Sequence, residues 1–501
     1  MFVRKKKNKS GKISVQVIDK SSGKYKVIKS FGSSDNPLVV EDLYKKAQQW
    51  IKDYLGIIEF DFNGKSLANK FFDNIEAITV SGTELLFNKL YNQIGFNQID
   101  NELFKRLVFS RIIFPTSKLK TADLLSKFQD VTVNVQRFYR YLDKLYREDK
   151  KKVQQISYQH TKKILGDKIT IVFYDVTTLY FEIDDEDEIR KRGFSKDGKH
   201  QKPQLVLGLL VSKGGYPLDY EIFEGNKFEG QTMLPVIDTF KKKYNLEHLI
   251  IVADSGMLSK KNMEQLQERG YKFIVGARIK NESEQIKEKI LALNLSNGGS
   301  AVINKNGLTL IISYSADRAR KDKNNRQRGL KRLERQINSG RLTKAQINNR
   351  GYNKYLKLDG DVKISIDYQR FEEDNKWDGL KGYITNTDLD KDSVIENYQH
   401  LWKIEEAFRI TKHDLKIRPI YHRRQERIEA HIIICFAAYK IYKELERILK
   451  IKDAKLTPEK AIEVVRTIYS IKVKIPESGE IVEKTLFLTE EQKYLANLFD
   501  I

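Results

Sequence analysis

The sequence predicts a mixed α/β protein, and three observations lead to that prediction. Two nearly continuous apolar runs, 168–175 and 248–253, have the pattern of strands buried on both faces. Segments with helical periodicity, 232–244 and 259–269, alternate with the later strands. Longer helical stretches precede and follow this region. We therefore expect an α/β core between a mainly helical N-terminal region and a helical C-terminal tail.

The part of the chain before the core divides into two regions. Alternating apolar side chains predict a β-hairpin at 12–31, and helical periodicity follows at 40–55. A longer helical stretch begins at 83, in which Asp100 or Asn101 can cap a helix that Pro115 ends. The expected regions are 1–80, with the hairpin and its helix, and 81–165, which is helical.

One helix of the second region, at 135–147, has a basic exterior. Phe138 and Leu142 form its apolar stripe, and Arg137 and Arg140 lie beside that stripe. Basic residues interleaved with aromatic ones can contact phosphates and stack on bases. An ordinary amphipathic helix with a basic surface has the same pattern, so both interpretations stay open. The first makes 81–165 a DNA-binding region, with Arg137 and Arg140 as candidate contacts.

Strand patterns dominate the segment 166–280, which we assign to the first part of the core. After the strand at 168–175, two further strands at 205–211 and 218–223 are joined by a turn at Gly214–Gly215. A helix, a strand, a helix and a last strand at 273–277 follow. The predicted order is therefore three strands with hairpin-like links and then two strands that each follow a helix.

The pattern breaks between 281 and 390. A hairpin at 301–314 turns at Asn306–Gly307, and a densely basic stretch follows at 318–335. We expect a β-rich basic insertion here. Helical periodicity at 393–415 then opens the second part of the core, 391–440, and 441–501 reads as the helical tail.

The segment from Tyr398 to Lys412 is predicted to form one helix with two faces. Leu401, Ile404, Phe408, Thr411 and Leu415 recur at helical spacing as an apolar stripe. Glu405 lies off that stripe and shares a second face with Tyr398, Arg409 and Lys412. That face can hold a metal beside a phosphate, and a solvated face with ion pairs explains the same spacing.

The composition of the chain indicates what kind of partner it binds and in which compartment it works. The chain has 91 Lys and Arg against 68 Asp and Glu, a formal charge of +23, which favours a polyanion such as nucleic acid. Cys435 is the single cysteine, so cysteine-rich metal sites and internal disulfides are excluded. The longest apolar run, 432–439, is far shorter than a membrane span. We expect a cytoplasmic protein with no membrane partner.

Three acidic residues stand at positions where they can converge. Asp175 ends the first buried strand, Asp254 follows the fourth, and Glu405 lies on the helix after the insertion. If the first and fourth strands are neighbours, both aspartates lie at one sheet edge. Three carboxylates without Cys suit Mg²⁺, or Mn²⁺ in its place, and two such ions can activate phosphodiester hydrolysis. Each aspartate alone is equally explained as a turn or helix cap.

The same residues resemble a known family. Tyr398, Glu405 and Lys412 have the spacing of the Y-x2-R-x3-E-x6-K signature of DDE transposases of the IS-four-like group, found in bacterial insertion sequences. YDVTTLYFE around Asp175 and VADSGM around Asp254 are similar to the two aspartate motifs of that family, and FEGNKFEGQT between them is also similar. Leu401 stands where the family has Arg, and Arg409 is our suggested substitute.

The resemblance implies a fold and a reaction. It implies a ribonuclease-H-like core in which Asp175, Asp254 and Glu405 hold two Mg²⁺ ions, while Tyr398 and Lys412 contact the DNA backbone. The implied activity is a transposase that binds the terminal inverted repeats of its element as a homodimer. It would cut the ends of double-stranded DNA and join the 3′ ends to target DNA, at the bacterial nucleoid.

Two other functions remain as alternatives. A structure-selective nuclease would share the acids but not the end-specific binding, and a non-catalytic DNA-binding relic would agree with Leu401. Two further motifs are rejected. Gly225–Thr232 imitates a P-loop but has Gln231 where the lysine belongs, and the seven histidines lack zinc-hydrolase spacing.

Overall fold

The computed structural model describes residues 1–56, 69, 71–257, 260–340, 342, 347–348, 351–359, 363–475 and 478–501. These residues form two compact units. One comprises 1–77 with 472–483, and the other 78–471 with 484–501. Among the described residues, no helix is long and apolar enough to cross a membrane.

The N-terminal residues form a small sheet with a helix packed on it. The predicted hairpin is confirmed as β2 (Ile13–Asp19) and β3 (Lys26–Ser34), and α1 (Pro37–Tyr54) covers it through Val40 and Ala47. A further strand, β1 (Phe2–Lys7), pairs with β2 and was not predicted. Its sequence, FVRKKK, has almost no apolar alternation, so only the pairing reveals it.

The helical region predicted after residue 81 is confirmed, and so are the residues predicted to begin and end one of its helices. Asn101 caps α4 by accepting a hydrogen bond from the Leu103 amide at 3.0 Å, and α4 ends two residues before Pro115. The helices are α3 (Gly82–Ile94), α4 (Glu102–Ile113), α5 (Lys118–Gln129), α6 (Val135–Lys144) and α7 (Lys150–Ile164).

The centre of the larger unit is an eight-stranded sheet of order β10-β11-β14-β9-β8-β5-β6-β7. The first and fourth core strands are neighbours, which is the condition for both aspartates to lie at one sheet edge: β5 pairs with β8 in parallel, and β8 pairs with β9 in parallel. All other pairs are antiparallel. The strands are β5 (Ile171–Tyr180), β6 (Gln204–Ser212), β7 (Pro217–Glu224), β8 (Ile250–Ala253), β9 (Lys272–Ala277), β10 (Ser300–Lys305), β11 (Leu308–Tyr314) and β14 (Leu380–Thr385).

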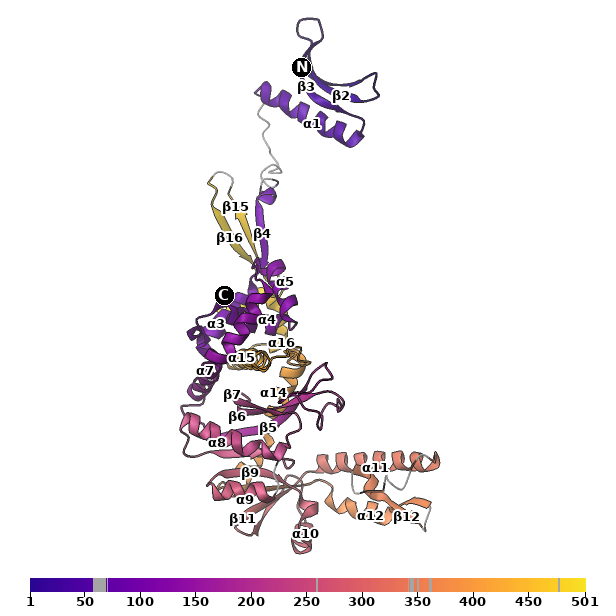
Figure 1. Ribbon diagram of the computed structural model, residues 1–501, viewed down its shortest axis with the longest axis vertical. Helices are drawn as coiled ribbons and strands as arrows, with labels where there is room; N and C mark the ends of the chain where they lie inside the picture. The colour runs from indigo at the N-terminus through magenta and orange to yellow at the C-terminus, as the bar shows by residue number, and fades with distance from the viewer. Residues whose placement is uncertain are drawn as a thin grey trace. The chain divides into compact units, whose positions relative to one another are not determined.

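The expected insertion is smaller than the sequence suggested. The hairpin β10–β11 and the strand β14 extend the main sheet, because Leu310, Ile312 and Ile384 join the apolar cluster on one sheet face. The part outside that sheet consists of α11 (Ala316–Asn338), β12 (Leu356–Asp359), β13 (Lys363–Ile366) and α12 (Tyr368–Glu373), with its own small core (Figure 1).

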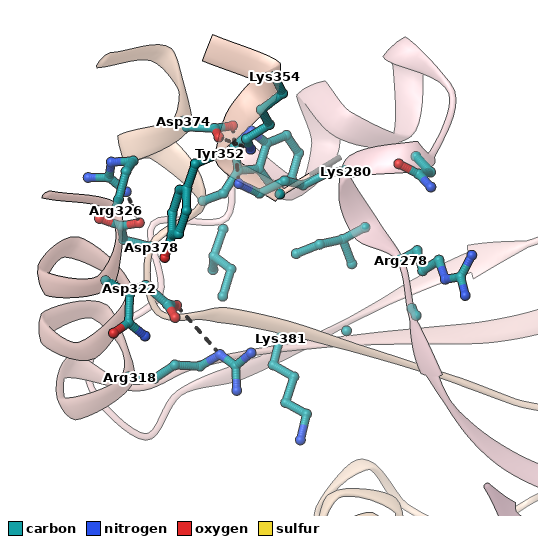
Figure 2. Close-up of a pocket in the computed structure, with 18 of the residues that line it drawn as sticks. Arg278, Lys280, Arg318, Asp322, Arg326, Tyr352, Lys354, Asp374, Asp378 and Lys381 are labelled. Carbon is teal, nitrogen blue, oxygen red and sulfur yellow. Dashed lines mark hydrogen bonds and ion pairs between the residues drawn. The ribbon is translucent and has the colours of Figure 1, made fainter. Parts of the chain in front are cut away.

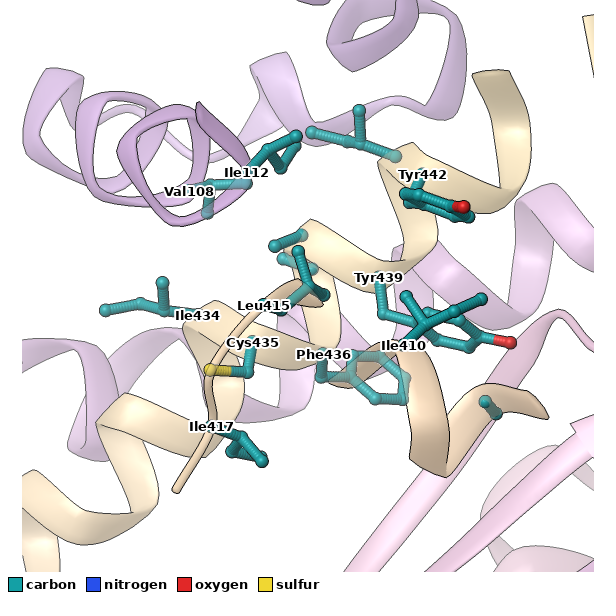
Figure 3. Packing of buried hydrophobic residues seen from close by; sticks show 14 of the residues in the cluster. Val108, Ile112, Ile410, Leu415, Ile417, Ile434, Cys435, Phe436, Tyr439 and Tyr442 are labelled. Atoms are coloured by element: carbon teal, nitrogen blue, oxygen red, sulfur yellow. The ribbon is translucent and has the colours of Figure 1, made fainter. Parts of the chain in front are cut away.

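Helices cover both faces of the sheet. On one face, α8 (Met233–Tyr244) and α9 (Lys260–Glu268) pack over side chains such as Val172 and Tyr174; Ser259, the expected start of α9, lies outside the described residues. The other face carries Phe173 and Leu179 and packs against α15 (Gln425–Ile451) and the N-terminal helices. Figure 3 shows Val108 and Ile112 of α4 facing α15 across this cluster. Cys435 is fully buried in this cluster.

The C-terminal tail is not purely helical. It contains α16 (Pro458–Val465) and α17 (Glu490–Phe499), but β15 (Tyr469–Lys474) and β16 (Ile481–Leu486) lie between them. These strands form a three-stranded sheet with β4 (Ile75–Val80). The prediction failed here because YSIKVK and IVEKTL are short, charged strands that need the distant partner β4.

Candidate active site

Asp175 and Asp254 lie at neighbouring positions of the central sheet. The parallel pairing of β5 with β8 ends at the pair Tyr174–Ala253, and each aspartate is the next residue along the chain. Asp175 does not end its strand, which corrects the prediction: β5 continues to Tyr180 because it stays paired with β6. The expected juxtaposition therefore holds, although only β8 stops there.

The Asp175 side chain points to the sheet face that α14 covers. It alternates with Tyr174 and lies on the same side as Phe173 and Leu179, which belong to the cluster of that face. Its side chain is 19% exposed. Burial raises the pKa of Asp175 to about 6, although the Lys196 ammonium lowers it. This carboxylate is thus held in a site where added positive charge would stabilise it.

Lys196 supplies one such positive charge, and sequence reasoning missed it. Its Nζ lies 3.7 Å from Asp175 Oδ1 and 3.1 Å from Glu229 Oε1. It also donates a hydrogen bond to the Val176 carbonyl at 2.8 Å. The ammonium group therefore lies between two carboxylates at the edge where a metal ion was predicted.

The segment FEGNKFEGQT is tied to β5 at this point. Tyr174 Oη donates to Thr232 Oγ1 at 2.9 Å, and Thr232 Oγ1 donates to the Glu229 carbonyl at 2.6 Å. Gly208 of β6 makes room for this tyrosine, because an added Cβ would lie 2.5 Å from Tyr174 Oη. These contacts place Glu229 beside the residue that precedes Asp175.

Asp254 is exposed and is held by Tyr398. The Tyr398 hydroxyl donates to Asp254 Oδ1 at 3.1 Å, and its ring is buried against Tyr383. Gly276 of β9 permits this approach, since a Cβ there would lie 2.5 Å from Tyr398 Oη. Burial, followed by the Asp254 charge, raises the pKa of Tyr398. Tyr398 is therefore a buried neighbour of Asp254 rather than an exposed group on the Glu405 face.

The predicted single helix at 393–415 is interrupted. It consists of α13 (Lys391–Gln399), a turn at His400–Leu401, α14 (Trp402–Arg409) and a π-helical turn, η8 (Ile410–Asp414). Tyr398 and Glu405 consequently lie on different helices. The apolar stripe is confirmed, because Leu401, Ile404, Phe408, Thr411 and Leu415 are all buried.

Glu405 is exposed on α14, which packs against β5 and β6. The charges of Asp254 and Glu405 both act on Tyr398 and on Lys381, whose Nζ lies 4.5 Å from the Tyr398 ring centre. Glu405 thus shares its surroundings with Asp254. Among the residues that the structure describes, however, no three His, Cys, Asp or Glu side chains are close enough to hold one metal ion.

The other two members of the predicted face have partners within the chain. Arg409 is exposed and pairs with Asp414 at 3.4 Å. Lys412 is 10% exposed and pairs with Asp197 at 3.4 Å. Burial lowers the pKa of Lys412, although Asp197 raises it. Leu401 is buried, so no side chain at that position reaches a phosphate.

A short loop, Ser195–Gly198, connects these groups, and the sequence analysis did not single it out. It carries both Lys196, beside Asp175, and Asp197, which pairs with Lys412 and with Arg418. Buried Ser195 shapes the loop by accepting hydrogen bonds from the Asp197 and Lys199 amides at 3.3 and 3.1 Å. The available signal was the basic, glycine-containing run RGFSKDGKHQKP between two strands.

Arg137 and Arg140 are exposed on α6, whose Phe138 and Leu142 are buried as predicted. Tyr139 is not free for stacking, since it lies under Arg427, whose guanidinium carbon is 5.1 Å from the ring centre. Both interpretations of this helix, a DNA contact and a solvated basic face, agree with these positions.

Lys381 also lines a cavity of about 630 Å³ between β9, β14 and α11, which we name the β14 cavity. Figure 2 shows Arg326 beside Asp378, and Arg318 paired with Asp322 at 3.6 Å. Asp374 binds Lys280 at 3.1 Å and also Lys354. Three aspartates therefore neutralise much of the basic lining of this cavity.

Comparison with known proteins gives one family. Residues 166–441, more than half of the chain, match the family described as Transposase DDE domain. No protein of curated function matches the chain.

Two solved transposase structures resemble it loosely. The piggyBac transposase in a synaptic complex with hairpin DNA is 11% identical, with a TM-score of 0.38 over 72% of this chain and 69% of that chain. The Mos1 transposase in a paired-end complex with the left transposon end is 11% identical, with a TM-score of 0.16 over 34% of this chain and 58% of that chain.

The family match carries the assignment by itself. It begins just before β5 and ends within α15, so it contains Asp175, Asp254 and Glu405 together with the sheet that positions them. The chain belongs to the Transposase DDE domain family and is a DNA transposase.

Proposed function

We propose that this transposase cuts the ends of its own element by metal-dependent phosphodiester hydrolysis and joins the 3′ ends to target DNA. The observation that carries the proposal is the position of Asp175 and Asp254, one residue past the last parallel pair of β5 and β8, with the Glu405 helix packed on β5. Such an edge, with carboxylates from two strands and a helix, is suited to phosphoryl chemistry.

The donor set agrees with a divalent cation. Transposases of this family use divalent metal ions, and carboxylate oxygens are the ligands that Mg²⁺ and Mn²⁺ prefer. The Lys196 ammonium between Asp175 and Glu229 supports the idea that this edge attracts positive charge. Asp175, Asp254 and Glu405 would hold two Mg²⁺ ions, which when bound lower the pKa of water and stabilise a leaving oxygen.

The chain's own residues have distinct roles in this proposal. Tyr398 orients Asp254 through its 3.1 Å hydrogen bond, so it is a positioning residue. Lys196 balances the negative charges of Asp175 and Glu229. Lys412 lies with Arg418 around Asp197, where both cations can face a DNA phosphate. Arg409, exposed one turn beyond Glu405, remains our substitute for the signature arginine that Leu401 replaces.

The finer classification is also a proposal. The sheet order β7-β6-β5-β8-β9 agrees with a ribonuclease-H-like core, and the spacing of Tyr398, Glu405 and Lys412 supports the IS-four-like group. The partner would be double-stranded DNA carrying terminal inverted repeats at a bacterial nucleoid, as the charge of +23 favours. Two copies, one at each end, would form the synaptic complex; sedimentation with and without end DNA measures this.

The test is strand cleavage of a duplex that contains an element end, in Mg²⁺. We expect Asp175→Asn, Asp254→Asn and Glu405→Gln each to reduce cleavage to background while DNA binding persists. Glu406→Gln is the matched control, because Glu406 lies on the same helix but pairs with Lys403 at 3.1 Å. This control should keep cleavage within about threefold of the wild type, because its carboxylate pairs with Lys403 and is not one of the proposed metal ligands.

Full cleavage by all three acid variants would refute the proposal. Competition between end DNA and random DNA adds a second criterion. A protein that cuts both equally well and joins neither to a target is a nuclease rather than a transposase that recognises its element's ends.

A further inference from the structure

A second basic cavity lies where α4 and α5 meet the segment 416–422, and we name it the α5 cavity. Its volume is about 470 Å³. The lining includes four Arg or Lys side chains and two histidines, and none of its residues is Asp or Glu. The basic lining residues are Arg111, Lys118, Lys416, Arg418, His422 and His431.

Lys118 is the central observation. It opens α5, its side chain is buried with 4% exposure, and it lines the cavity. Within the part of the chain that the structure describes, no carboxylate pairs with it and no acceptor receives a hydrogen bond from its Nζ. A buried ammonium group without a partner is unfavourable, because desolvation is not repaid by any interaction. Burial, reinforced by Arg111, lowers the pKa of Lys118 to about 7.

The neighbouring groups are arranged as donors. Arg111 is buried, and its Nη2 donates to the Thr116 carbonyl at 3.3 Å and lies 3.5 Å from His431 Nδ1. His431 Nε2 lies 2.9 Å from the Ile417 carbonyl and donates to it, which leaves Nδ1 as the acceptor for Arg111. The guanidinium is therefore fixed in place by neutral groups, and its charge is not neutralised.

Two acids around the cavity, Asp143, whose charge acts on His422, and Asp197, are paired with cations. Asp143 accepts two hydrogen bonds from Arg427, at 2.8 and 2.9 Å, and also pairs with Arg424. Asp197 pairs with Lys412 and Arg418 at the rim. Arg418 is therefore paired, whereas no described acidic side chain pairs with Arg111 or Lys118, and the cavity keeps a surplus of positive charge. The N-terminus of the 12-residue helix α5 adds a favourable dipole for an anion.

We propose that the α5 cavity binds a phosphate group of the DNA backbone. Lys and Arg donors around a desolvated space recognise phosphate, and a phosphate is the anion that a transposase meets most often. The volume admits a phosphate with its sugar, and Tyr421, 72% exposed at the cavity, can lie against the sugar or base. The choice of DNA rests on the proposed function, whereas the affinity for phosphate does not.

The cavity is connected to the candidate active site. Arg418 lies over the ring of Tyr180 at 5.8 Å, and the Ile420 amide donates to the Tyr180 carbonyl at 3.3 Å. Tyr180 is the last residue of β5, five residues after Asp175, or about 17 Å along the strand.

The test compares Lys118→Met with Lys127→Met, a matched control that removes one positive charge from the exposed side of the same helix. Two quantities are measured on the full chain: the thermal shift caused by inorganic phosphate against chloride at equal ionic strength, and the affinity for duplex DNA across a salt series. We expect phosphate to stabilise the wild type and the control but not Lys118→Met. DNA affinity should fall about tenfold in Lys118→Met, and its salt slope by about 1, with less than a threefold loss in the control.

Each other outcome counts against the proposal in a defined way. If phosphate produces no shift in the wild type, the cavity is not an anion site. If phosphate acts through Lys118 but both variants bind DNA equally, the site takes free phosphate and the DNA assignment is wrong. Strand cleavage is not measured in this test. A wild type that passes it but never cuts DNA would refute the proposed function alone.

Discussion

The two basic cavities of the larger unit differ in how their positive charges are matched. The β14 cavity is lined by six Arg and Lys side chains and three aspartates, and all three aspartates pair with cations of that lining. The α5 cavity is lined by four Arg and Lys side chains and no acid. The positive charges that make up the net charge of +23 are therefore not equally available to a ligand in the two cavities. A bound phosphate stabilises the protein most where the lining cations have no acidic partner.

Removing a cation should therefore change the stability of the protein in opposite directions in the two cavities. In the β14 cavity, a cation is part of the folded network, and its removal leaves a half-buried aspartate without that partner. In the α5 cavity, Lys118 is an isolated buried charge, and its removal relieves a desolvation penalty. Three substitutions test this difference, from the largest effect to the smallest.

Arg326→Met should destabilise the α11 region by about 3 kcal/mol, because breaking a buried ion pair leaves its partner without compensation. Arg326 is buried, contacts Asp378 and Asn375, and lies 5.4 Å from the Phe371 ring centre. Hydrogen exchange of α11 measures the loss. Arg320→Met, an exposed residue on the same helix, is the control and should change stability by less than about 0.5 kcal/mol. Equal effects of the two variants would contradict the contrast.

Lys118→Met should instead stabilise the ligand-free protein, by about 2 kcal/mol at pH 7. The pKa of Lys118 is lowered to about 7 in the folded state, so the unfolded chain binds more protons between pH 7 and about 10. Wild-type stability should therefore rise with pH across that window, and this rise should shrink in the variant. Denaturant titrations at several pH values measure it. A destabilised Lys118→Met protein would show that the ammonium group has a structural partner.

Asp374→Asn should lower stability by about 1 kcal/mol at pH 7, after allowing for solvent screening. Burial raises the pKa of Asp374, but hydrogen bonds from Lys354 and Tyr355 and the nearby Lys280 outweigh it and hold the pKa at about 2. Because the folded pKa is below the ordinary 3.8, this stabilisation is present above about pH 4 and is lost as pH falls through 2. The wild type and the variant should thus converge in acid. A constant difference down to pH 2 would mean that charge is not the cause.

Several features of the candidate site follow from local sequence. Asp254 was placed directly after its strand because HLIIVA is apolar and stops there. The sequence analysis assumed that the first and fourth core strands are neighbours, and the pairing of β5 with β8 meets that condition. The buried stripe from Leu401 to Leu415 followed from helical spacing, and its burial holds even though the helix is interrupted at His400–Leu401. Short-range periodicity is sufficient for these features, since each depends on one segment facing the core.

Other features needed contacts between segments far apart in the chain. Asp175 lies within β5 because pairing with β6 continues after the partner β8 has stopped. Tyr398 turns to Asp254 because Gly276 leaves space for it. A sequence pattern reports which residues prefer a strand, a helix or the interior, and these are local preferences. Which cation meets which carboxylate, and whether Lys118 meets none, is decided only when distant segments pack and the desolvation of each charge is set.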